Sequence, residues 1–261
     1  MEQAASAAPR RLQGRVVLVT GGGSGIGRAA ALAYGREGAI VVVAGRRAAA
    51  IEETAALIRA AGGTASSCIA DVSQGGSVKH LIDDVLARHG RLDIAFNNAG
   101  VEGRFAPIGE LEEADFDAVV ATNLKGAWLC IKHQVAAMRA GGQGGAIVNT
   151  SSWLASRPVA KASAYAASKA GIDAMMRSVA LEAGPEGIRI NNVYPGIIDT
   201  PMFHRLGDAQ ALARFAAVTP LGRAGQPADV GDVALWLSSD EARFVTGQSV
   251  MVDGGFTLAS A

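Results

Sequence analysis

Tyr165 and Lys169 stand four residues apart in the alanine-rich stretch ASAYAASKAG, which spans residues 162–171. Residues with this spacing on an α-helix lie on one face. A free phenol has a pKa of about 10 and exchanges protons poorly at neutral pH, but a neighbouring ammonium group stabilises the phenolate. Lowering that pKa by about 3 takes about 4 kcal/mol of differential stabilisation. The pair therefore indicates a tyrosine acid/base tuned by Lys169.

Ser152 precedes this pair, at the carboxyl end of a strand expected over residues 145–152. A hydroxyl there can donate a hydrogen bond to a substrate oxygen, because open parallel sheets bind ligands beyond the carboxyl ends of their strands. Each residue alone has a plainer explanation: Tyr165 can pack on a helix face, Lys169 can be solvated, and Ser152 can cap a helix. Together they favour proton transfer to or from an alcohol or carbonyl group.

A glycine-rich segment, TGGGSGIG at residues 20–27, follows the first expected strand. Its register is G-x-x-x-G-x-G, at Gly21, Gly25 and Gly27, and differs from the strict G-x-G-x-x-G pattern. Glycines permit a tight turn and close backbone approach, and a helix N-terminus offers amide donors to a pyrophosphate. A plain glycine turn is the alternative, but the flanking strand and helix favour dinucleotide binding.

The end of the second expected strand bears on which dinucleotide binds. NAD sites place an acidic residue there to bond the ribose hydroxyls. In VVVAGRR, at residues 41–47, Gly45 takes that place and Arg46 and Arg47 follow. A guanidinium can pair with a 2′-phosphate, so the sequence favours NADP, with NAD as the alternative. Two solvated arginines at the start of a helix are the plainer explanation.

Short β-branched runs alternate with alanine-rich segments along the 261 residues. We expect strands at 15–20, 39–45, 64–70, 92–97, 145–152, 188–195 and 248–254, and helices near 25–37, 48–61, 75–88, 112–139, 163–183 and 227–238. This alternation predicts the α/β class, as a single doubly wound Rossmann-type domain. Its seven-stranded, mainly parallel sheet would have helices on both faces.

The expected domain spans residues 12–261, after a flexible N-terminal tail over residues 1–11. A less regular insert near 197–226 holds Pro201, Pro220, Phe203 and Phe215, and Pro227 directly follows it. It follows the sixth strand, at the edge of the sheet where ligands bind. We expect this insert to form a lid over the ligand site.

The composition excludes several classes of protein. Formal net charge is zero, charged residues make up 18% and hydrophobic ones 49%, so the chain has no basic field for nucleic acid. No apolar run reaches the roughly 18 residues that a membrane-spanning helix needs. Cys68 and Cys130 match no disulfide or metal-ligand spacing, and the four histidines are not grouped. We expect a cytoplasmic protein without a metal.

In the order and spacing of its motifs the chain resembles the short-chain dehydrogenase/reductase family, over nearly all of residues 12–256. The matching motifs are TGGGSGIG at 20–27, DV at 71–72, NNAG at 97–100, TNLKG at 122–126, SS at 151–152, YAASK at 165–169, PGIIDT at 195–200 and VDGG at 252–255. No single one of these motifs is specific, but their combination is.

The resemblance implies a catalytic tetrad of Asn123, Ser152, Tyr165 and Lys169. Tyr165 would exchange the alcohol proton, and Ser152 would orient and polarise the substrate oxygen. Lys169 would lower the phenol pKa and bind the nicotinamide ribose, while Asn123 would hold a water in a proton relay. Hydride would pass directly between the nicotinamide and the carbinol carbon, with no metal.

The resemblance also maps the cofactor contacts. They are Gly21, Ser24, Gly25, Ile26, Gly27, Arg46, Asp71, Val72, Asn98, Ala99, Gly100, Tyr165, Lys169, Pro195, Gly196, Ile198 and Thr200. Some of these residues are also typical of plain turns, namely Asp71, the NNAG segment and Pro195 with Gly196. Ser24 stands before Gly25 where a common NADP pattern has a basic residue, so Arg46 carries most of the argument for NADP.

The activity implied is NAD(P)-dependent interconversion of a secondary alcohol and a ketone, and an apolar lid favours a hydrophobic or cyclic ketone. The alternatives are a reductase of 3-oxoacyl thioesters in lipid synthesis, a non-catalytic module that senses the cofactor, and a lyase or epimerase relative. Candidate substrate-pocket residues are Glu102, Trp153, Phe203 and His204. The resemblance also implies a homotetramer, which pairs the helices near 112–139 and 163–183 and the C-terminal SVMVDGGF segments.

Overall fold

The protein's computed structural model describes residues 10–259, in which strands and helices alternate. The strands are β1 (Val16–Thr20), β2 (Ile40–Gly45), β3 (Thr64–Ile69), β4 (Ile94–Asn97), β5 (Gly145–Thr150), β6 (Ile188–Pro195) and β7 (Ser249–Val252). Each lies within two residues of its expected bounds. The α-helices are α1 (Gly25–Arg36), α2 (Ala48–Ala60), α3 (Gly75–His89), α4 (Glu113–Val119), α5 (Gly126–Gly141), α6 (Ser163–Ala183), α7 (Phe203–Leu206), α8 (Ala209–Val218), α9 (Pro227–Ser238) and α10 (Phe256–Ala259).

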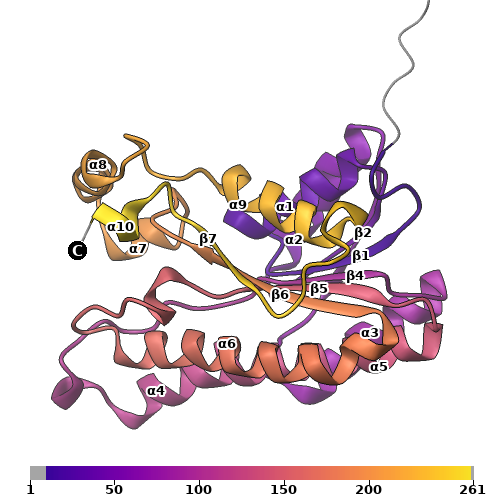
Figure 1. Cartoon of the computed structure of the whole chain (residues 1–261), viewed down its shortest axis with the longest axis horizontal. Helices are drawn as coiled ribbons and strands as arrows, with labels where there is room; N and C mark the ends of the chain where they lie inside the picture. Colours follow the sequence, from indigo (N-terminus) through magenta and orange to yellow (C-terminus); the bar gives the residue numbers. More distant parts are fainter. Residues whose placement is uncertain (1–9, 260–261) are drawn as a thin grey trace, which may run out of the picture.

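The seven strands form one sheet in the order β3-β2-β1-β4-β5-β6-β7, and all six pairings are parallel. Helices α1, α2 and α9 cover one face, and α3, α4, α5 and α6 cover the other (Figure 1). The strand order reverses direction between β1 and β4. A crevice for ligands opens at such a switch point, beyond the carboxyl ends of the strands. The predicted doubly wound fold is thus confirmed.

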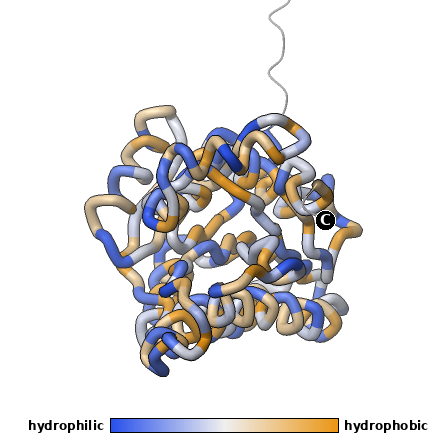
Figure 2. Tube along the Cα trace, turned by 90° about the vertical axis from the view of Figure 1, so that its left-hand side faces the viewer, coloured by the Kyte–Doolittle hydropathy of each residue, from blue (hydrophilic) through white to orange (hydrophobic). Residues whose placement is uncertain are grey.

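Successive side chains of β1 point to opposite faces of the sheet, and the core therefore has two layers. Val17 and Val19 point toward the α1 and α9 side, while Val16 and Leu18 point toward the α3 and α5 side. All four side chains are buried, as expected for a strand covered on both faces. Figure 2 shows how hydrophobic and hydrophilic residues alternate along the chain.

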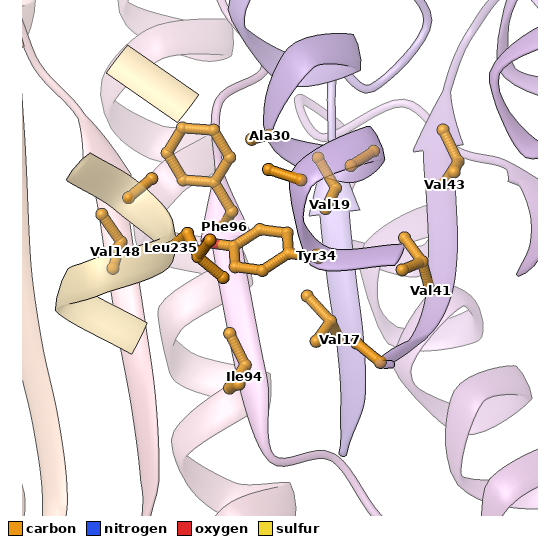
Figure 3. Packing of buried hydrophobic residues seen from close by; sticks show 14 of the residues in the cluster. Val17, Val19, Ala30, Tyr34, Val41, Val43, Ile94, Phe96, Val148 and Leu235 are labelled. Atoms are coloured by element: carbon orange, nitrogen blue, oxygen red, sulfur yellow. The ribbon is translucent and has the colours of Figure 1, made fainter. Parts of the chain in front are cut away.

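Tyr34 lies at the centre of the first layer, between α1 and the sheet, and packs near Phe96 and Leu235 (Figure 3). Its ring is fully buried, and its hydroxyl lies 3.0 Å from the Ser238 hydroxyl. That contact satisfies the polar tip of a ring that otherwise fills the core. Helices α1 and α9 are held together around this tyrosine.

The helix expected over 112–139 is interrupted. A π-helical stretch, Val120–Lys125, separates α4 from α5 and carries Asn123. A π-helical stretch widens the helix by one residue per turn and often occurs at functional sites. The insert near 197–226 is more regular than expected, because it contains α7 and α8. An edge-on contact between Phe215 of α8 and Phe256 of α10, with ring centroids 5.8 Å apart, joins the insert to the C-terminal helix.

The predicted tail over residues 1–11 lies mostly outside the described residues, since positions 1–9 are not described. Arg11 contacts the domain: its backbone nitrogen donates to Glu37 at 2.9 Å, and its guanidinium pairs with the same carboxylate at 2.8 Å.

A ladder of amide side chains crosses the sheet below its carboxyl edge. Asn97, Asn149 and Asn192 are paired in register on β4, β5 and β6. Asn97 donates to Asn149 at 2.9 Å, and Asn149 donates to Asn192 at 3.0 Å. Gln134 of α5 exchanges hydrogen bonds with Asn97 at one end of the ladder. The ladder fixes the register of three strands whose ends carry the candidate site.

Candidate active site

A cavity of about 1010 Å³ opens at the carboxyl ends of the strands, on both sides of the switch between β1 and β4. It is lined by every catalytic and cofactor-binding residue expected from the sequence except Gly27 and Asn123. The residues therefore meet at one place although they span positions 21 to 200. Whether each one contacts a ligand stays a prediction.

The glycine-rich turn forms one wall of this cavity. Gly21 has a φ of +66°, and a Cβ added there would lie 2.8 Å from the Cα of Ala99. Gly25, at the start of α1, has a φ of +52° and faces Thr200. Gly27 does not line the cavity. It packs against the turn, since a Cβ on it would lie 2.3 Å from the backbone oxygen of Gly21. Gly27 thus lets α1 pack against the turn.

Lys169 lies at the floor of the cavity with only 3% of the residue exposed. Its Nζ atom donates to the backbone oxygen of Thr150 at 2.7 Å and lies 5.6 Å from the ring centroid of Tyr165. Burial lowers the pKa of this amine to about 8. The amine is therefore mostly charged at neutral pH, and two of its three donors are left for other partners.

Tyr165 and Ser152 face each other across the same part of the cavity. Burial raises the pKa of the phenol to about 12, and the charge of Glu102 adds to the rise. A hydrogen bond from the Ser152 hydroxyl opposes it. Because the Ser152 oxygen accepts from the backbone nitrogen of Leu154 at 3.2 Å, its hydroxyl proton stays free to donate.

The direction of the Tyr165 pKa is opposite to that expected from the sequence. Lys169 was expected to lower it, but its ammonium group donates to the backbone oxygen of Thr150 and lies 5.6 Å from the centroid of the tyrosine ring. Desolvation of the phenolate is the main cause of the rise, and it outweighs the hydrogen bond with Ser152. The structure holds the phenol in its protonated form at neutral pH.

Asn123 lies behind the cavity wall. Its amide accepts from the backbone nitrogen of Val101 at 2.8 Å and donates to the backbone oxygen of Val101 at 2.9 Å. It also donates to Ser168 at 3.2 Å. These contacts clamp the segment after Gly100 onto the π-helical stretch and α6. The water relay expected of Asn123 stays a prediction, because the partners of its amide here are protein groups.

Two threonines that the sequence did not single out hold the turn after β4. The Thr20 hydroxyl accepts from the backbone nitrogens of Asn98 and Ala99 at 3.2 and 3.3 Å. The Thr150 hydroxyl donates to the Asn98 side chain at 3.2 Å. Both threonines end a strand that neighbours β4, and this strand-end position is the signal by which they could have been found.

The positive charges expected to bind phosphate lie at the end of β2. Arg46 and Arg47 both line the cavity, and Arg47 donates to the Ser24 hydroxyl at 3.2 Å. The sequence had favoured Arg46, whereas the hydrogen bond to the glycine-rich turn belongs to Arg47. Asp71 also lines the cavity, and its carboxylate accepts from the backbone nitrogen and hydroxyl of Ser73.

These groups form a donor set suited to the phosphates of a dinucleotide. The N-terminus of α1 and the guanidinium groups of Arg46 and Arg47 face the same cavity end, where an anion is favoured. At Gly100 a Cβ would lie 3.2 Å from Asn123 and 3.6 Å from the Lys169 amine. The absent side chain leaves the backbone open beside that amine. The residues present therefore fit a nicotinamide dinucleotide.

The opposite end of the cavity is mostly apolar. It is lined by Phe105, Trp153, Leu154, Val159, Met202, Phe203, Leu206, Ala211 and Phe215. The ring of Phe105 lies 6.1 Å from that of Tyr165, centroid to centroid. Glu102, Trp153 and Phe203 thus line the cavity as expected. His204 does not; its ring contacts Asp199 at 2.7 Å.

Two features are absent from residues 10–259. No helix among them is both long and apolar enough to cross a membrane. The same residues contain no group of three or more histidine, cysteine and acidic side chains placed to hold a metal ion.

Comparisons with known proteins identify the family. A family model described as enoyl-(acyl carrier protein) reductase matches residues 21–257. The chain is 41% identical over 243 residues to cis-4-hydroxycyclohexanecarboxylate dehydrogenase of Sinomonas cyclohexanicum, covering 93% of this chain and 96% of that one. It is 35% identical over 248 residues to a 3-oxoacyl-(acyl-carrier-protein) reductase of Thermotoga maritima, covering 95% and 100%.

A solved structure of a short-chain type dehydrogenase/reductase from Mycobacterium marinum superimposes with a TM-score of 0.90 at 33% identity, covering 95% of this chain and 98% of that one. The family model, the relatives and the shared fold agree across almost the whole chain. The protein is an oxidoreductase that belongs to the short-chain dehydrogenase/reductase family.

Proposed function

We propose that the protein interconverts a secondary alcohol and a ketone with a nicotinamide cofactor, NADP in preference to NAD. The observation that carries this proposal is the meeting of Ser152, Tyr165 and Lys169 in one cavity, whose far end carries the glycine-rich turn and two arginines. A nicotinamide bound along that cavity supplies the hydride in reduction and accepts it in oxidation.

In reduction, the substrate oxygen gains negative charge and requires a proton. Tyr165 donates that proton, since its phenol is held in the protonated form at neutral pH. Ser152 donates a hydrogen bond to the same oxygen. Its hydroxyl proton is available because the contact with Leu154 uses only the Ser152 oxygen, as an acceptor. Lys169, whose amine is buried nearby, stabilises the phenolate that remains.

The preference for NADP rests on the end of β2. Gly45 leaves no carboxylate there to bond ribose hydroxyls or to repel a phosphate. Arg46 and Arg47 offer two guanidinium groups, which bind phosphate oxygens in a planar, bidentate way. The hydrogen bond from Arg47 to Ser24 holds one of them beside the glycine-rich turn.

The substrate class follows from the apolar end of the cavity. Trp153, Phe203 and Phe215 give it flat, rigid walls, which suit a ring or another compact hydrophobic group. A relative acts on a hydroxycyclohexane carboxylate, as its name states. We propose a hydrophobic or cyclic ketone, such as a substituted cyclohexanone, and the corresponding alcohol.

A panel of ketones and alcohols tests this function. Each compound is mixed with the protein and NADPH or NADP⁺, and the absorbance of the reduced cofactor is followed, with Tyr165→Phe as the control. We expect turnover of cyclic ketones by the wild-type protein and its loss in the variant. Equal turnover by the two proteins would refute Tyr165 as proton donor. No turnover of any ketone or alcohol with either cofactor would refute the proposed activity.

Reduction of 3-oxoacyl thioesters is the second candidate. It is favoured by the relative from Thermotoga maritima and by two exposed basic residues, Arg157 and Lys161, in the segment after Trp153. An acidic carrier protein would dock on such charges. If this candidate holds, an acetoacetyl thioester is reduced with a higher kcat/KM than any cyclic ketone, and Arg157→Glu lowers that value for the carrier-bound substrate alone.

We also propose that the protein assembles as a homotetramer in the cytoplasm. Apolar side chains are exposed where the family pairs its subunits: Trp128 on α5, Leu181 on α6 and Met251 on β7. Their burial between subunits would remove them from water. Light scattering at micromolar concentration should give the mass of four chains, and the mass of one chain would contradict the assembly. Both cysteines are free, which fits a reducing compartment.

A further inference from the structure

Glu102 and Arg205 form an ion pair across the apolar end of the cavity. Glu102 follows the segment that Asn123 clamps, and Arg205 belongs to α7 of the insert. The guanidinium contacts both carboxylate oxygens: Nε donates to one and Nη2 donates to the other at 3.0 Å. Both residues line the same cavity as Ser152 and Tyr165.

The pair stands apart from the other charges of the cavity wall. Six charged residues within the described part of the chain line the cavity. Arg46, Arg47 and Asp71 lie at the nucleotide end, and Lys169 lies at its floor. Glu102 and Arg205 belong to the two segments that bring Phe105 and Phe203 to the cavity wall. The charge at this end therefore sums to zero as long as both are ionised.

Glu102 is the more enclosed partner. Its side chain is 16% exposed, against 57% for that of Arg205. The Arg205 guanidinium lowers the pKa of the Glu102 carboxyl, so the carboxylate is charged at neutral pH. A second carboxylate entering this end would meet the like charge of the enclosed Glu102 carboxylate. It would also find the guanidinium already bound to Glu102.

On these grounds we propose that Glu102 determines substrate specificity: it occupies Arg205 and thereby selects uncharged substrates over anionic ones. The inference rests on the proposed function, because it assigns a substrate class to the same cavity. It further implies that Arg205 becomes a carboxylate-binding group once the charge of Glu102 is removed, since a guanidinium recognises carboxylates bidentately.

The proposal is tested with two substrates that differ by one carboxylate, cyclohexanone and 4-oxocyclohexanecarboxylate. The kcat/KM of each is measured for the wild-type protein, Glu102→Gln, and Glu102→Gln combined with Arg205→Gln. We expect the ratio of the anionic to the neutral substrate to rise at least about tenfold in Glu102→Gln, and to fall back in the double variant. Glu113→Gln, which removes an exposed charge of α4 outside the cavity wall, should leave the ratio unchanged.

An unchanged ratio in Glu102→Gln would overturn the proposal, as would a gain that survives the loss of Arg205. Calorimetric titration of the same two compounds into each protein, preloaded with NADP⁺, separates this failure from failure of the proposed activity. If no ketone is turned over, the affinity ratio still reports charge selection: a tenfold rise in Glu102→Gln supports the proposal, and an unchanged ratio or binding of neither compound overturns it.

Discussion

The Nζ atom of Lys169 donates a 2.7 Å hydrogen bond to the backbone oxygen of Thr150, at the carboxyl end of β5. This bond ties α6, which carries Tyr165, to the strand that leads into Ser152. It also places a buried ammonium group beneath the aromatic ring of Tyr165. The acid/base pair expected from the sequence is therefore built through the backbone of the sheet as much as through direct contact between the two side chains.

Lys169→Met should change how stability depends on pH. The pKa of Lys169 is lowered from 10.5 to about 8 by burial. Between these values the unfolded chain binds more protons than the folded one, so this lysine makes the wild-type protein more stable as pH rises. We compare the free energy of unfolding of the wild-type protein with that of the variant. The wild-type value minus the variant value should increase by up to about 3 kcal/mol between pH about 8 and about 10.5. Urea unfolding measures it, and a difference constant with pH would contradict the buried-ammonium account.

Arg46→Ala and Arg47→Ala should each reduce the preference for NADP. In the proposed function each guanidinium is a charge-assisted hydrogen-bond donor to the 2′-phosphate, so we expect the ratio of kcat/KM for NADPH to that for NADH to fall about tenfold. Arg36→Ala, at the far end of α1, serves as control and should keep the wild-type ratio. If the ratio is unmoved in both variants, the 2′-phosphate does not bind at the end of β2.

Asn149→Ala should destabilise the protein strongly. Asn149 is fully buried and lies between Asn97 and Asn192, so the variant removes an acceptor from one and a donor from the other. Unpaired buried amide groups and the small cavity together should cost about 2–4 kcal/mol in urea unfolding. Gln248→Ala, an exposed amide on the loop before β7, should cost less than about 0.5 kcal/mol. If Asn149→Ala also lowers the free energy of unfolding by less than about 0.5 kcal/mol, the amide ladder does not stabilise the sheet.

The strands and most helices could be predicted because each carries its own signal, such as the consecutive apolar residues of β1. The break at residues 120–125 could not. A π-helical stretch shifts the helix by one residue, and the apolar pattern on either side of Asn123 reads as one continuous helix. Its cause is tertiary, because the Asn123 amide reaches both backbone groups of Val101.

The members of the candidate site could be predicted from motif spacing, but their electrostatics could not. Spacing places Tyr165 and Lys169 on one face of α6. It does not reveal that burial raises the pKa of the phenol and that Thr150 binds the amine. In the same way, nothing local in the sequence pairs Glu102 with Arg205, since these residues meet only when the insert folds over the cavity.

The central claim is that Tyr165 donates the proton in ketone reduction. Tyr165→Phe removes the phenolic oxygen and keeps the ring, so kcat with NADPH should fall by about 10²–10⁴-fold while the dissociation constant for NADPH stays within about threefold of wild type. Tyr34→Phe, in the core between α1 and the sheet, should stay active. A Tyr165→Phe protein that retains more than about a tenth of the wild-type kcat would contradict this account.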